Sequence, residues 1–193
     1  MSTGDRKFKD TLLEIKDIKL LLKVPDVNAS EEGFIVHDGA ILFPLSSIKG
    51  IQSNLIHALI DERNQNGKFV DFYDFSARMK HCGLSLPTLI KMIDSGALDS
   101  LYPSRASLRS SASAAMNYAE MMFGESGSQA LLNLGIEKPA MIIRKDDPRE
   151  NLEGEYETLG MMVSGSPLSF YKERLSKENI VPLGELDGTS GNV

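Results

Sequence analysis

The sequence predicts a mainly α-helical fold, with a small β-hairpin near the N-terminus followed by two successive helix–glycine turn–helix units and further helices. Three observations support this fold class. Apolar residues recur at helical spacing over much of residues 45–123. An Asp38-Gly39 pair separates two short apolar runs, as in a β-hairpin. Gly50 and Gly83 each lie between two helical patterns, so the middle of the chain is expected to consist of paired helices.

The N-terminal region is expected to combine one helix with the β-hairpin. Residues 8–23 show an amphipathic pattern and are predicted to form a short helix. Pro25 ends this helix, because a proline disfavours the helical conformation of the residue before it. Residues 34–36 and 40–43 supply the two apolar runs around the Asp-Gly turn. We therefore expect a small two-stranded piece here.

Residues 45–65, here called hairpin one, read as a short helix, a tight turn at Gly50 and a second helix. Ser53 or Asn54 is expected to cap the second helix. Such a turn directs free backbone N–H groups toward one point beside the positive end of a helix dipole, which is a geometry that binds phosphate. A helix-hairpin-helix element holds a nucleic-acid backbone in this way without reading bases. The same residues also fit a plain corner between two helices, and both interpretations stay open.

Residues 71–95, here called hairpin two, repeat this plan. A helix over residues 69–79 precedes a turn at His81-Cys82-Gly83. A second helix follows, with Pro87 tolerated in its first turn, and Ser95-Gly96 ends it. A tandem pair favours DNA binding more than a single corner would.

The remainder of the chain is predicted to hold one clear helix, a linker and a second helical segment. Residues 104–123 form the clear helix, with an apolar stripe that includes several methionines and is expected to be core. Residues 124–154 lose periodicity and are expected to be a linker. An apolar island interrupts this linker at residues 130–136, and residues 155–175 resume a helical pattern.

Composition limits the classes of function. The 193 residues carry a net charge of −6, which argues against a protein that coats nucleic acid generally. Of the three segments 1–40, 41–123 and 124–193, only residues 41–123 are not acidic, with 8 basic and 7 acidic groups. A local DNA contact is therefore permitted there. The single Cys82 excludes a disulfide framework. With no transmembrane-length window and no signal peptide, we expect a cytoplasmic protein that contacts no membrane.

The sequence contains no pattern of a catalytic or metal site. A polymerase needs paired carboxylates that hold two divalent metals, and no acidic pair here has a suitable strand context. No P-loop or dinucleotide-binding fingerprint is present. The histidines are scattered and give no zinc site: His37, His57 and His81. We therefore expect the chain to be non-catalytic, without metal or cofactor.

A series of sequence blocks resembles the bacterial replicative DNA polymerase III α subunit of the DnaE type. In chain order they are PDVNAS from Pro25, LSSIKGIQ from Leu45, LIDERN, DFYDFSARM, LIKMIDSGALDSL and EYETLGMMVSGSPLSFY. The match covers roughly residues 10–180 and implies that the chain is an excerpt of a DNA-directed DNA polymerase, whose catalytic, Mg²⁺-binding acids lie outside it. The implied division is residues 1–44 as the end of the fingers, 45–103 as the tandem helix-hairpin-helix, 104–123 as a supporting helix, 124–154 as a linker, and 155–193 as a segment leading toward an OB-fold domain.

The resemblance and the turn geometry together give the expected DNA contacts. Hairpin one is expected to contact the duplex backbone through Lys49, Gly50, Ile51, Gln52, Ser53 and Asn54, with Lys68, Arg78 and Lys80 extending the track. Gln52 stands where the family usually has glycine, and Ser85-Leu86-Pro87 replaces a usual polar or basic pair in hairpin two. We therefore expect hairpin two to be mainly structural. The alternative function is a helical protein-interaction scaffold whose hairpins only pack, and a stand-alone enzyme is disfavoured because no site is visible.

The apolar island lies where the resembled family carries an internal peptide that binds the sliding clamp. In this interpretation Gln129 hydrogen-bonds at the rim of the clamp pocket, while Leu132 and Leu134 enter apolar pockets. The usual closing phenylalanine is absent, so we expect weak affinity. The alternative is that these leucines fold back onto the helix at residues 104–123.

Overall fold

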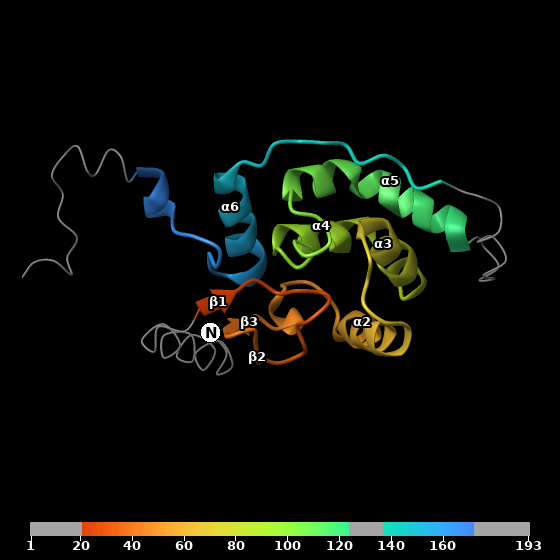
Figure 1. The fold of residues 1–193 in the computed structure, drawn as a ribbon, viewed down its shortest axis with the longest axis horizontal. Helices are drawn as coiled ribbons and strands as arrows, with labels where there is room; N and C mark the ends of the chain where they lie inside the picture. Colours follow the sequence, from red (N-terminus) through yellow and green to blue (C-terminus); the bar gives the residue numbers. More distant parts are fainter. Residues whose placement is uncertain (1–20, 124–136, 172–193) are drawn as a thin grey trace, which may run out of the picture.

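The structure is a computed structural model that describes residues 21–123 and 137–171. These residues form three short strands followed by a group of packed helices (Figure 1). The elements are β1 (Leu21–Lys23), β2 (Ile35–His37), β3 (Ala40–Leu42), η1 (Leu45–Ser47), α2 (Ser53–Asn66), α3 (Phe72–His81), α4 (Leu86–Asp94), α5 (Arg105–Phe123), α6 (Pro148–Leu159) and η3 (Pro167–Tyr171). The described part of the chain is thus mainly helical, as the sequence predicts.

The strands form one small sheet in the order β1–β3–β2. The antiparallel pair β2–β3 is the predicted hairpin, and its turn places Asp38 and Gly39 at positive φ values of 49° and 73°. The prediction of a helix through residue 23 is wrong at its end, because Leu21–Lys23 is a strand that pairs in parallel with β3. The Phe43 amide extends this pairing with a 3.0 Å hydrogen bond to the carbonyl of Lys23. Strand β3 therefore lies between two neighbours and is buried.

The hydrophobic core joins the sheet to the helices. Figure 1 shows α5 lying across α3 and α4, and it packs against both. Tyr73 of α3 meets Tyr118 of α5 edge to face, with ring centroids 5.7 Å apart. The apolar stripe predicted for residues 104–123 is buried in this contact, at Leu108, Ala112, Ala115, Met116 and Ala119.

Two of the helix starts in the hairpins are capped by side chains, and one is not. Asp71 accepts hydrogen bonds from the amides of the second and third residues of α3, and Ser85 accepts one from the third residue of α4. Helix α2 begins at Ser53 behind Gln52, whose side chain makes no cap bond. The expectation that Ser53 or Asn54 caps this helix is therefore wrong. The Asn54 carboxamide instead accepts from the next amide, at 2.9 Å.

The stretch expected to be an aperiodic linker contains the start of a helix. Residues 137–147 are extended and run along α5 (Figure 1), where Ser107 and Ser111 accept hydrogen bonds from their backbone. Helix α6 begins at Pro148 behind the Asp147 cap and ends at Gly160, whose φ is 81°. The helical pattern expected over residues 155–175 therefore starts seven residues earlier. It is also interrupted after Leu159 and resumes as the short 3-10 helix η3, and residues 172–175 lie outside the described residues. Within the described ranges, no helix is long and apolar enough to cross a membrane.

Candidate nucleic-acid interface

The turn of hairpin one is exposed, and the apolar residues just before it are buried. Leu45 and Ile48 are buried in the core on the N-terminal side of the turn. Gly50 then adopts a φ of 75°, which is the left-handed region that favours glycine. Apart from the half-buried Ile51, the residues predicted to contact DNA in this turn are exposed: Lys49, Gly50, Gln52, Ser53 and Asn54. The sequence prediction of a tight glycine turn leading into a helix is thus correct in geometry.

The backbone amides of this turn differ in whether they are already paired. The Lys49 amide donates to the Thr158 carbonyl at 2.9 Å, and the Ile51 amide donates to the Ile48 carbonyl at 3.4 Å. Within the described ranges, four neighbouring amides have no acceptor: those of Gly50, Gln52, Ser53 and Asn54. These N–H groups lie at the N-terminal end of α2, where the helix dipole is positive. The turn therefore has the donors that an anion would need.

Two lysine side chains lie beside this turn. The Nζ atom of Lys49 is 3.2 Å from the position that a Cβ would occupy at Gly160, so it lies at the C-terminal end of α6. Lys91 of α4 extends over Gly50, with its Cε 3.5 Å from the equivalent Cβ position and its Nζ nearer still. Sequence reasoning missed Lys91, because it lies 41 residues away in the other hairpin and no local pattern relates it to the turn.

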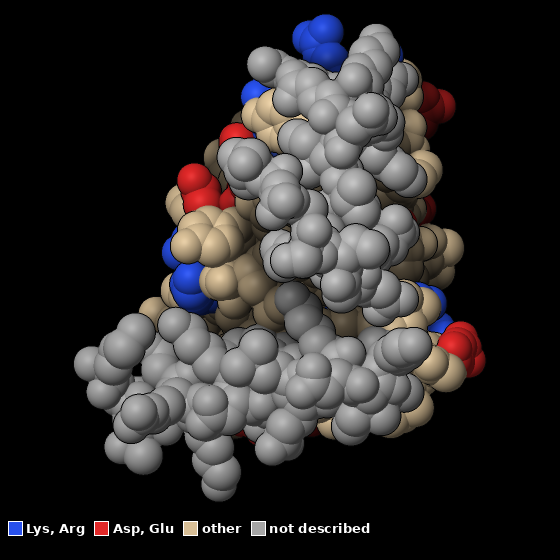
Figure 2. Space-filling view, turned by 90° about the vertical axis from the view of Figure 1, so that its left-hand side faces the viewer, with Lys and Arg blue, Asp and Glu red and all other residues tan. Residues whose placement is uncertain are grey.

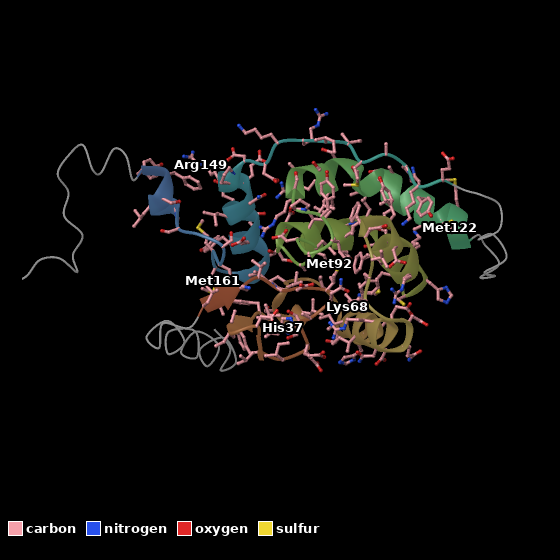
Figure 3. All side chains as sticks on the ribbon, viewed as in Figure 1. His37, Lys68, Met92, Met122, Arg149 and Met161 are labelled. Atoms are coloured by element: carbon pink, nitrogen blue, oxygen red, sulfur yellow. The ribbon has the colours of Figure 1, made fainter. Side chains whose placement is uncertain are left out.

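The other predicted basic residues are arranged differently. Arg78 is largely enclosed, with an ion pair to Glu62 at 2.9 Å and its guanidinium 4.3 Å from the centre of the Phe69 ring. Lys80 pairs with Glu120 at 2.7 Å. Lys68 is exposed at the junction of α2 and α3 (Figure 3) and makes no ion pair within the described residues. Of these three cations, Lys68 is the one whose charge is left available.

Hairpin two has the same helix–turn–helix arrangement, but the backbone N–H groups of its turn already donate within the hairpin. The turn amides of Cys82, Gly83 and Leu84 all donate to carbonyls at the end of α3, at 2.9 to 3.0 Å. Ser85 caps α4, and Pro87 contributes no N–H at all. The second turn therefore offers fewer free donors than the first.

A metal site or a reactive thiol would each require specific groups on the described surface. Where described residues are visible in Figure 2, basic and acidic side chains are interspersed among uncharged ones. No group of three or more His, Cys, Asp or Glu residues in the described ranges is placed to hold a metal ion. Burial and the nearby Glu62 carboxylate raise the pKa of the Cys82 thiol, so it stays protonated at neutral pH. The described surface thus offers donors and cations for an anion, and no activated nucleophile at Cys82.

A glycine turn between helices, repeated once and backed by one core, defines a helix-hairpin-helix module. The family described as "Helix-hairpin-helix motif" matches residues 19–108. The chain is 32% identical to the DNA polymerase III subunit alpha of Vibrio cholerae over 181 residues, which is 89% of this chain and 16% of that protein. It is 34% identical to the Pseudomonas fluorescens protein of the same name, over 88% of this chain and 17% of that protein.

The corresponding protein of Escherichia coli K12 is 33% identical over 79% of this chain and 14% of its own length. The chain therefore belongs to the DNA polymerase III subunit alpha family, and it corresponds to about one sixth of the length of the first two relatives. The three residues expected to contact a clamp, Gln129, Leu132 and Leu134, lie outside the described residues.

Proposed function

We propose that this chain is a non-catalytic DNA-binding and tethering segment of a replicative DNA polymerase, and that hairpin one holds the phosphate backbone of duplex DNA. The observation that carries this proposal is the set of four amides, at Gly50, Gln52, Ser53 and Asn54, that have no acceptor among the described residues. Amides in this arrangement bind phosphate oxygens, which carry no base information, so binding is independent of sequence. Lys49 adds positive charge beside this turn, and Lys68, beyond the opposite end of α2, adds charge farther along the surface.

The wider assignment rests on the relatives, which are named DNA polymerase III subunit alpha. In this proposal the polymerisation activity, with its Mg²⁺-binding carboxylates, belongs to parts of the parent protein beyond this chain. In the cytoplasm the chain binds the duplex backbone and packs against other polymerase domains. The competing proposal is a protein-interaction scaffold, in which both hairpins only pack.

Duplex binding by the 193-residue chain distinguishes these functions. We expect the logarithm of affinity to fall linearly with the logarithm of salt concentration, because bound cations are released from the phosphates. Gly50→Val should abolish binding, since it strains the turn, and Lys49→Glu should weaken it. Gly83→Val is the matched control: Gly83 also has a positive φ of 94° but faces open space in hairpin two. Absent or salt-independent binding by the wild type would favour the scaffold, whereas equal loss in both glycine variants would contradict the assignment of the contact to hairpin one.

We also propose that the island around Gln129 tethers the polymerase to its sliding clamp, as the resemblance implies. The support is the sequence order of a glutamine followed by Leu132 and Leu134. A synthetic peptide of residues 126–137 should bind clamp weakly, and a Gln129→Ala, Leu132→Ala peptide should not. Absence of binding by the native peptide at high micromolar clamp would remove this tether from the proposal.

A further inference from the structure

We propose that Lys91, in the second helix of hairpin two, is a phosphate-contacting residue of hairpin one. This inference rests on the proposed function and adds to it a cation that lies over Gly50. In this proposal both hairpins contribute to the site: hairpin one supplies the backbone amides and hairpin two supplies the ammonium group. The ligand is a phosphodiester of the duplex backbone.

The position of Lys91 supports this role. Its side chain crosses from α4 to Gly50, where Cδ and Cε lie 3.9 and 3.5 Å from the Cβ position and Nζ lies closer. A side chain at residue 50 would displace this ammonium group. Glycine is therefore suited to this position for two reasons: it adopts the positive φ of 75°, and it leaves room for the lysine. The Lys91 ammonium group therefore lies beside Gly50, whose amide is one of the four without an acceptor among the described residues.

No carboxylate among the described residues neutralises the charge of Lys91. Within the described residues Lys91 makes no ion pair, and the nearby Asp94 on the same helix is engaged by Arg109. Lys91 is half-buried, so its stem has less freedom than that of a fully exposed lysine. A half-buried ammonium without a counter-ion gains from an arriving phosphate, because the low local dielectric strengthens the attraction.

Lys49 differs from Lys91 in its surroundings. The Lys49 ammonium lies at the C-terminal end of α6, where helix carbonyls are partly negative and already stabilise a cation. Lys91 has its ammonium over Gly50 itself. We therefore assign the larger part of the local electrostatic attraction to Lys91 and a smaller part to Lys49.

The test compares duplex affinity across a salt series for four forms of the 193-residue chain. Lys91→Met keeps the aliphatic stem and removes the charge, whereas Lys91→Arg keeps the charge. The matched control is Lys145→Met, an exposed lysine on the extended segment that runs along α5. We expect Lys91→Met to reduce the steepness of the salt dependence by about 0.9, one phosphate contact, and to weaken binding severalfold at low salt. Lys91→Arg and Lys145→Met should behave as wild type.

Several outcomes would overturn the inference. One is Lys91→Met with wild-type affinity and salt dependence while Gly50→Val still loses binding, which leaves the proposed function intact. Another is an equal loss in Lys145→Met, which would reveal a diffuse charge effect. Absence of salt-dependent binding by the wild type would remove the proposed function and this inference together. Circular dichroism and thermal unfolding establish that each variant is folded, and Lys91→Gln replaces Lys91→Met if the latter is not.

Discussion

The backbone N–H of Lys49 donates a 2.9 Å hydrogen bond to the carbonyl oxygen of Thr158, so the turn of hairpin one is attached to the C-terminal end of α6. These two residues are far apart in sequence, and the bond links the candidate DNA contact to a helix outside the tandem hairpins. Helix α6 is in turn positioned by α4 and α5. The geometry of the turn therefore depends on contacts that are made well away from it.

The first prediction concerns Glu155, which fixes α6 to α5. Glu155 is fully buried, pairs with Arg105 at 2.9 Å and accepts the Val163 and Ser164 amides at 2.7 and 2.9 Å. Glu155→Gln should lower the free energy of unfolding by about 3 kcal/mol, because it leaves part of a buried charge network unpaired. Urea denaturation measures this. The control Glu157→Gln, exposed on the same helix, should change it by less than about 0.5 kcal/mol. Equal effects in both variants would contradict the role of the buried pair.

The second prediction concerns Gly154, where α6 approaches α4. A Cβ at this position would lie 3.2 Å from both the Cβ and the carbonyl oxygen of Asp94. Gly154→Leu should therefore push the helices apart and destabilise the chain by about 1–3 kcal/mol. Because Thr158 moves with α6, duplex affinity should also fall, under conditions where the variant remains folded. Glu153→Leu is the neighbouring exposed control. If a folded Gly154→Leu chain kept full duplex affinity, DNA binding by the turn would not depend on the position of α6.

Much of this fold follows from local sequence patterns. The Asp38-Gly39 turn, the glycine turns of both hairpins and the apolar stripe of α5 are each encoded by residues close together in the chain. Strand β1 was not predictable in this way, because Leu20 to Leu22 fit an amphipathic helix as well as a strand. Its conformation is decided by parallel pairing with Ala40–Leu42, a contact about nineteen residues away. Such non-local pairing overrides local propensity.

The features of the candidate site also divide into local ones, which the sequence predicts, and non-local ones, which it does not. The exposed turn at Gly50 and its helix could be predicted because the glycine and the apolar spacing after it are local patterns, although the capping residue expected for this helix was wrong. The engagement of Arg78 by Glu62, the approach of Lys91 and the bond to Thr158 could not, since each joins separate elements. The start of α6 differs from the prediction because residues 148–154 fall inside the expected linker, whose polar composition hides the helix start at Asp147-Pro148. The same pair is a helix start, with the carboxylate as cap and the proline in the first turn.

The third prediction concerns Arg78, whose guanidinium joins α2 to α3. It donates to the Glu62 side chain at 2.9 Å and to the Gly67 carbonyl at 2.9 Å, and it stacks over Phe69. Arg78→Lys keeps the charge but loses the fork of donors, so it should destabilise the chain by about 1–3 kcal/mol. The salt dependence of duplex binding is compared in Arg78→Met, which removes the charge; it should stay unchanged while the variant remains folded, because this cation is already paired with Glu62. A salt dependence reduced by about 0.9 in Arg78→Met would instead make Arg78 a DNA contact.

The fourth prediction concerns Asp71, which caps α3 and pairs with Lys138. Burial acts to raise the pKa of this carboxyl, but the hydrogen bond from Lys138 and those from the Asp74 and Tyr73 amides together hold it below its ordinary value of 3.8. A carboxyl with a lowered pKa binds fewer protons when folded, so stability rises with pH across the interval between the two pKa values. The stabilisation is complete above pH 3.8 and is lost as the pH falls through the folded pKa.

Asp71→Asn tests this directly, because asparagine also caps helices but does not titrate. We expect the wild type to be more stable than the variant above pH 3.8, and this difference should shrink as the pH falls through the lowered pKa of Asp71. Urea unfolding of both forms between pH 3 and pH 7 gives the difference at each pH. Asp71→Ala, which also removes the cap, should cost about 1 kcal/mol more at neutral pH. A wild-type and Asp71→Asn difference that is constant with pH would mean that the charge of Asp71 contributes nothing and that the cap alone starts α3.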